Sequence, residues 1–142
     1  MASYYINEAA FTLPDLGFVD RTVHVLEARL PGDDPLGLIV ARQVVPAGKT
    51  LRQLVVEHLR SDALRLKGFV VIEEHEIYVG RAAAIEVRSR WRHEGTVLYQ
   101  RQAHLAASGS WLMFAMTAPL DQQAACDAAL DQVLATLALR TD

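Results

Sequence analysis

The sequence has a single cysteine, Cys126, so the chain cannot form an internal disulfide. It contains no apolar run near the roughly 20 residues that a membrane-spanning helix requires. Its first residues show neither the basic start nor the continuous apolar core of a secretory signal peptide. Together these three absences predict a protein of the reducing cytoplasm, with no insertion of its own into a membrane.

An excess of positive charge is also missing. The chain has 14 Lys and Arg residues against 17 Asp and Glu residues, for a net charge of −3. Proteins that hold nucleic acid electrostatically need a basic stripe, so a nucleic-acid partner is disfavoured. The 142 residues are 51% hydrophobic and 22% charged, which predicts one globular domain over residues 1–142.

Familiar catalytic and metal-binding patterns are absent as well. The five histidines lack the spacing of metal ligands, and no glycine-rich phosphate loop is present. The segment Ser108-Gly109-Ser110 falls in a hairpin turn and not in a strand-to-helix elbow. Glu73 and His75 share a strand face, but two ligands are fewer than a zinc site uses, so a solvated charged edge is favoured. We therefore expect a binding protein, not an enzyme, without cofactor or metal.

The first third of the chain shows strand patterns. Two short fragments, Ser3–Ile6 and Ala10–Leu13, are broken at Asn7-Glu8. Longer apolar alternations predict strands over Asp20–Arg29 and Leu36–Gln43, separated by a turn rich in Gly, Asp and Pro.

A helix is predicted to follow, with Thr50 as its N-cap and Gln53 three residues later in a capping box. Gly68 is predicted to end this helix. The next segment, Phe69–Ala118, alternates with period two and breaks at three glycine-containing turns, which predicts a four-strand antiparallel meander. The turns are Gly80, Glu94-Gly95 and Ser108-Gly109.

After the meander, Asp121 is the predicted cap of a second helix, whose inner apolar stripe includes Cys126 as a small buried hydrophobe. Strands and helices segregated in this order predict an α+β fold with a largely antiparallel sheet backed by two main helices.

The predicted sheet carries more apolar surface than two helices can cover. The strand Ser110–Ala118 is apolar on both faces, as is Leu36–Ala41. Six strands span about 29 Å, whereas a helix is about 10 Å wide, so two helices cover roughly one face. The other face should keep an apolar strip that meets a partner. The alternative, left open by the residues themselves, is a central sheet covered on both sides by the chain itself.

Polar side chains are expected within this strip. Leu98, Gln100 and Gln102 alternate onto one strand face. On the first helix, His58 and Asp62 lie one turn apart, close to the apolar stripe, where they can hydrogen-bond.

The N-terminal residues resemble a known family. Asn7-Glu8, Phe11-Thr12-Leu13-Pro14 and the stretch Asp20–Leu26 are similar to the start of the DcrB-like family, and more specifically to the effector-associated (Eag-type) chaperones of bacterial type VI secretion. The resemblance continues through the helix after Pro46 and the strand 99–102 to the C-terminal helix.

This resemblance implies a curved, largely antiparallel sheet like that of Mog1 and the PsbP proteins. It also implies a cytoplasmic homodimer that shields the N-terminal transmembrane helices of a PAAR-containing effector until loading on the secretion spike. Polar groups, above all Gln102, would contact the client and not pack the fold; the polar contact from the first helix stays open. The implied client-binding residues are Val23, Val25, Leu38, Val40, His58, Asp62, Leu98, Gln100 and Gln102.

Two other functions remain compatible with the sequence. One is a Mog1-like module that binds a folded protein through its surface. The other is a carrier that holds a small hydrophobic ligand in the same concavity.

Overall fold

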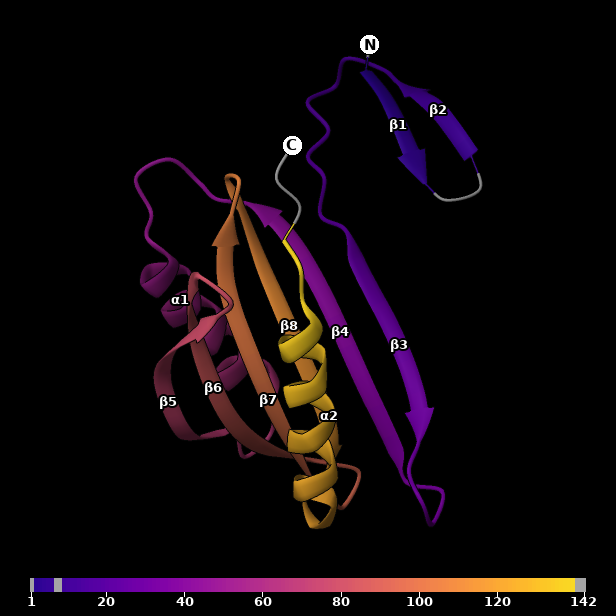
Figure 1. Cartoon of the computed structure of the whole chain (residues 1–142), viewed down its shortest axis with the longest axis vertical. Helices are drawn as coiled ribbons and strands as arrows, with labels where there is room; N and C mark the ends of the chain where they lie inside the picture. The colour runs from indigo at the N-terminus through magenta and orange to yellow at the C-terminus, as the bar shows by residue number, and fades with distance from the viewer. Residues whose placement is uncertain (1, 7–8, 140–142) are drawn as a thin grey trace.

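The computed structural model describes residues 2–6 and 9–139, with side chains from residue 9 onward. Its main feature is a six-stranded antiparallel sheet with the strand order β3-β4-β8-β7-β6-β5 (Figure 1). The strands are β3 (Val23–Arg29), β4 (Pro35–Val44), β5 (Val70–Val79), β6 (Ala82–His93), β7 (Thr96–Ala107) and β8 (Ser110–Pro119). The predicted fold class and the four-strand meander are confirmed.

The N-terminal strands form a separate two-stranded hairpin. Strand β1 (Ala2–Ile6) pairs antiparallel with β2 (Ala9–Leu13). Figure 1 shows the hairpin beyond one end of β3 and β4, away from the sheet. The predicted strand break at Asn7-Glu8 lies outside the described residues.

The first helix, α1 (Leu51–Arg65), begins as the sequence predicts. The Thr50 hydroxyl accepts from the Gln53 amide at 3.2 Å, and the Gln53 side chain accepts from the Thr50 amide at 2.8 Å. This capping box satisfies two of the amide groups that a helix start leaves without partners.

Tight turns connect the meander. Glu94 and Gly95 both have positive φ, as do Ser108 and Gly109. Two successive residues of this kind are typical of type I′ hairpin turns, whose twist matches that of the flanking strands. The turns therefore fix the register of β6 with β7 and of β7 with β8.

The second helix, α2 (Gln123–Thr136), begins later than predicted. Asp121 lies inside a short 3₁₀ turn, Leu120–Gln122, and the N-cap position is Gln122, without a side-chain cap bond. The prediction of Asp121 as cap is wrong because this extra turn follows β8 directly. Cys126 is fully buried, as predicted, and burial raises the pKa of its thiol to about 12.

The two helices lie on opposite faces of the sheet, α2 in front and α1 behind in Figure 1. Helix α2 packs through Cys126 and Leu130 on one face, whose core includes Tyr99 and Met116. On the other face, the α1 residue Val55 packs against Ile85 and Val87. The prediction that both helices share one face is therefore wrong. Within the described ranges, no helix is long and apolar enough to cross a membrane.

Candidate binding face

The face that carries α1 also carries an apolar surface that the helix leaves open. Helix α1 lies over β6 and β7, while β3, β4 and β8 extend beyond it on this face. Val23 and Val25 are 57% and 64% exposed. Their neighbours on β4 and β8 are half-buried. We call this surface the apolar strip; it consists of Val23, Val25, Ile39, Ala41, Trp111 and Met113.

Two of the predicted client-binding residues are not on this face. Leu38 and Val40 pair with Met116 and Phe114 and pack against the core under α2. Adjacent residues of a strand point to opposite faces of the sheet, so residues one position apart on β4 lie on different faces. The expectation that Leu38 and Val40 lie on the open apolar face is therefore wrong, and β4 presents Ile39 and Ala41 there.

The other predicted residues do share the α1 face, and several are joined by hydrogen bonds. Trp111 Nε1 donates to His104 Nδ1 at 3.1 Å, and His104 Nε2 lies 2.7 Å from Gln102 Oε1. Gln102 Nε2 donates to Gln100 Oε1 at 2.6 Å, and Gln100 Nε2 donates to Thr117 Oγ1 at 2.9 Å. We call this chain of five side chains the polar ladder.

Helix α1 joins the polar ladder through Asp62. The Asp62 carboxylate accepts from Gln102 Nε2 at 3.4 Å and lies 3.3 Å from His58 Nε2. Arg65 adds an ion pair at 2.7 Å. Gln102 and Asp62 are only 1% and 3% exposed. Both side chains therefore lie between α1 and the sheet, whereas His58 borders the strip and Leu98 remains partly exposed.

Burial keeps both histidines of this face neutral near pH 7. Burial, with a smaller contribution from the neighbouring His58, lowers the pKa of His104 to about 3. Burial also lowers the pKa of His58, although the Asp62 carboxylate opposes this effect. The rings of His58 and Trp111 lie edge to face, with their centroids 5.9 Å apart.

His104 and Trp111 are site residues that the sequence interpretation missed. A signal was available, because His104 continues the alternation Leu98, Gln100, Gln102 on the same strand face. Trp111 lies on β8 diagonal to His104, whose direct partner is Met113, and only the hairpin register brings the two rings together.

The opposite face holds a network of ion pairs beneath α2. Arg101 contacts Glu86 at 2.9 Å and Asp131 at 2.6 Å, and the Tyr99 hydroxyl donates to Asp127 at 2.7 Å. Burial alone would raise the pKa of Glu86, but the hydrogen bonds and positive charges of Arg101 and Arg88 together outweigh burial and lower it. These contacts attach α2 to the sheet, so we assign them to the fold.

The charged stretch on β5 is also accounted for by its own contacts. Glu73 and His75 are exposed and lie 2.9 Å apart, and they form one hydrogen-bonded pair. Across residues 9–139, no group of three or more potential metal ligands comes together.

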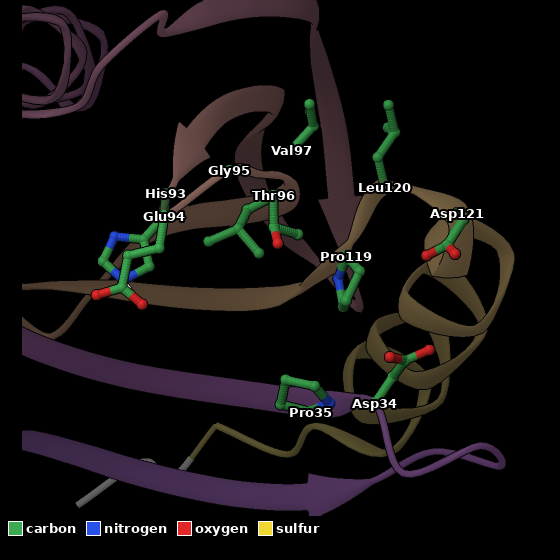
Figure 2. A pocket seen from close by; sticks show the side chains of 11 residues that line it. Asp34, Pro35, His93, Glu94, Gly95, Thr96, Val97, Pro119, Leu120 and Asp121 are labelled. Carbon is green, nitrogen blue, oxygen red and sulfur yellow. Dashed lines mark ion pairs between the residues drawn. The ribbon is translucent and has the colours of Figure 1, made fainter.

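A larger hollow of about 790 Å³ lies at the β6–β7 turn and the end of β8. Figure 2 shows Glu94 and Asp121 on opposite sides of the opening, with their carboxylates not directed toward one another. Asp34 already accepts from Gln122 at 2.9 Å. Without converging polar groups, this hollow is a weaker candidate than the apolar strip and the polar ladder.

Solved structures share the fold. A Pseudomonas aeruginosa protein of unknown function, PA94, is 21% identical over 100% of this chain and 99% of its own, with a TM-score of 0.81. LpqN of Mycobacterium tuberculosis, involved in cell envelope biogenesis, is 12% identical over 82% of each chain, with a TM-score of 0.58. The cyanobacterial PsbP of Synechocystis is 10% identical over 92% of this chain and 98% of its own, with a TM-score of 0.60.

These identities are low, so the three structures bear on the fold, and they confirm the predicted likeness to PsbP. A search of curated proteins finds no relative that matches this sequence. The DcrB family model matches residues 8–136, which is nearly the whole chain. The protein therefore belongs to the DcrB family.

Proposed function

We propose that this protein is a chaperone that binds apolar helices of a client protein, in the manner of the Eag-type chaperones of type VI secretion. The client would be the N-terminal transmembrane region of a PAAR-containing effector, held in the cytoplasm before loading on the secretion spike. The observation that carries the proposal is the apolar strip, open to solvent and bordered by a hydrogen-bonded polar ladder.

The dimensions of the strip support an elongated apolar occupant. An apolar helix of about 20 residues is about 30 Å long. Strand β4 has ten residues, and at about 3.3 Å per residue it is about 33 Å long. A helix laid along the strands would remove Val23 and Val25 from water, which is favourable in proportion to the apolar area buried.

Gln102 is buried within the fold, so the expectation that it contacts the client and does not pack the fold is wrong. The side chains of Gln102 and Asp62 are enclosed between α1 and the sheet, so they would support the site without reaching its surface. Gln100, Leu98 and His58 lie nearer the surface and would make the direct contacts. This arrangement favours an occupant that is mostly apolar, with small or polar residues on one side.

We also propose that the protein works as a homodimer. Within the described chain, the β1–β2 hairpin packs at most marginally on other elements. The segment that follows it exposes Leu16, Phe18 and Val19 to more than half of their surface. Strand β3 is a sheet edge with exposed side chains on both faces, and an open edge strand can pair with another chain. A second copy would cover these surfaces.

Co-expression tests the proposed chaperone role. We expect the neighbouring reading frame to encode a large protein with early apolar segments and a PAAR-like domain. Its soluble yield should rise when the two proteins are produced together, and both should elute as one complex. Capture of a folded soluble domain, with no binding of apolar segments, would instead support a Mog1-like module. A co-purified small molecule in native mass spectrometry would support a hydrophobic carrier.

A further inference from the structure

A basic hollow of about 450 Å³ lies at the end of the sheet where β5 begins and β6 ends. Arg90 and Arg92 of β6 line it, as does Lys67 in the segment after α1. Arg90 pairs with Tyr99, which packs in the core under α2, so both arginines lie on the α2 face and not on the face of the apolar strip. We call Lys67, Arg90 and Arg92 the basic triad.

Backbone contacts hold two members of the basic triad together. The amide of Arg92 donates to the carbonyl oxygen of Lys67 at 2.8 Å, which joins the segment after α1 to the end of β6. Gly68 has a φ of +66°, a conformation that favours glycine, and a methyl group there would lie 3.8 Å from Arg92 Cγ. The segment that carries Lys67 is therefore held against the stem of the Arg92 side chain.

The basic triad has no acidic partner within the described part of the chain. Arg88, the preceding residue on the same face of β6, contacts Glu86 at 3.0 Å and Asp127 at 3.3 Å. Across residues 9–139, by contrast, no member of the triad forms an ion pair or a side-chain hydrogen bond. Like charges at one hollow repel one another, so a bound anion would be stabilised there.

The rest of the lining is largely apolar. Val70 is 45% exposed, and Val97 and Leu120 are half-buried. Figure 2 shows the side chains of Val97 and Leu120 directed away from Asp34. An arginine guanidinium matches a planar carboxylate with two parallel hydrogen bonds. The hollow therefore suits a ligand that carries carboxylates next to apolar groups.

The surroundings favour a short peptide over a large polyanion. The neighbouring hollow at the β6–β7 turn is lined by Glu94 and Asp121, whose charges would repel a nucleic acid or an anionic membrane. Strand β5 is an edge of the sheet, to which an extended chain can add. Farther along β5, the stretch Glu73–Glu76 would repel an acidic chain, so only the end of β5 beside the basic triad is available to one.

We propose that the basic triad binds an extended acidic peptide segment of a partner protein. Arg90 and Arg92 are two positions apart on one strand face, so their Cα atoms are about 7 Å apart. Two acidic residues separated by one residue in an extended peptide have the same spacing, and each carboxylate can meet one guanidinium. This inference goes beyond the proposed function and does not depend on it. Because the faces differ, the peptide segment and an apolar helix can bind at the same time.

Two fluorescent peptides test the proposal by anisotropy. The first is Leu-Ser-Glu-Ser-Glu-Ser-Leu, with blocked ends and a neutral fluorophore; in extended form it places both carboxylates and both leucines on one side. The second has glutamine in place of both glutamates. We expect the glutamate peptide to bind the unsubstituted protein about tenfold more tightly than the glutamine peptide. This preference should shrink as salt is added, because the contacts are exposed.

Variants of the chain assign the preference to the basic triad. Arg90→Gln combined with Arg92→Gln removes two exposed charges without breaking an ion pair, so the fold should persist. We expect this double variant to bind both peptides equally. The matched control is Arg60→Gln combined with Arg81→Gln, which removes two exposed charges elsewhere. It should keep the affinity for the glutamate peptide within about twofold.

Three results would overturn the inference. The first is equal affinity of the two peptides for the unsubstituted protein, or no binding of either. The second is an equal loss of binding in the two double variants. The third is sedimentation with phosphatidylserine vesicles that requires Arg90 and Arg92, because the triad would then bind a lipid surface. Circular dichroism checks that each variant retains the sheet, and binding of an apolar peptide to the variants should be unchanged.

Discussion

Trp111 and His104 are joined by a hydrogen bond of 3.1 Å that links two neighbouring strands diagonally. This contact decides which nitrogen of His104 carries a hydrogen, since an indole cannot accept. Through Gln102 and Asp62 the same chain of bonds reaches α1. The polar ladder is therefore a connection between the sheet and α1 as well as part of the proposed binding face.

Gln102→Ala is expected to destabilise the fold. The change removes the partner of His104 Nε2 and of Gln100 Oε1 in a buried site, and unpaired buried groups cost about 1–3 kcal/mol. We expect urea unfolding to show a loss of about 2 kcal/mol in the free energy of unfolding. Gln43→Ala, at an exposed position of β4 on the same face, is the control and should cost under about 0.5 kcal/mol. Equal stability of Gln102→Ala and the unsubstituted protein would contradict the ladder.

Lowering the pH should destabilise the protein before its carboxylates titrate. The pKa of His104 is about 3 in the folded chain, against an ordinary value of 6.5, so the unfolded chain binds the proton first. The His104 contribution is fully present above about pH 6.5 and falls as the pH decreases, with a slope of up to about 1.4 kcal/mol per pH unit. His58, whose pKa is also lowered, adds to the effect beside Asp62 and Arg65.

Urea titrations at several pH values between 5 and 7.5 measure this dependence. His104→Gln should flatten the curve, because it keeps a neutral hydrogen-bonding side chain on the ladder. His24→Gln, at an exposed position of β3, should leave the slope unchanged. The same slope in His104→Gln and the unsubstituted protein would show that another group is responsible.

Two adjacent residues of β3 separate the faces of the sheet in a binding experiment. Val25 and Leu26 are 64% and 55% exposed, and they point to opposite sides of the same strand. We expect Val25→Asp to reduce binding of an apolar peptide by about tenfold or more, because a charge would be buried against the client. Leu26→Asp should have little effect. Comparable losses in both variants, measured by fluorescence anisotropy, would argue against the apolar strip as the binding face.

The proposed dimer predicts a mass of about 31 kDa in light scattering, twice the 15.7 kDa of one chain. Phe18→Glu places a charge at a side chain that is 60% exposed beside the hairpin, so the fold should persist while the dimer weakens. Leu64→Glu is the control, because Leu64 is 90% exposed on α1, away from the hairpin. A monomer of the unsubstituted protein, or a dimer indifferent to Phe18→Glu, would refute the hairpin interface.

The local sequence was sufficient to predict the order of the strands and helices. The Thr50 capping box, the glycine turns of the meander and the alternation along β7 are interactions between residues close in sequence. Each can be evaluated without knowledge of the rest of the chain. For the same reason, the placement of Gln100 and Gln102 on one strand face follows from the period of two.

Long-range packing decided what local patterns left open. The pairing of β4 with β8 joins residues about 75 positions apart, and it determines that Ile39, and not Leu38, reaches the apolar strip. The sequence by itself established an apolar excess and its polar neighbours. Only the tertiary structure placed the helices on opposite faces and enclosed Gln102, because both depend on how side chains of distant segments fill shared space.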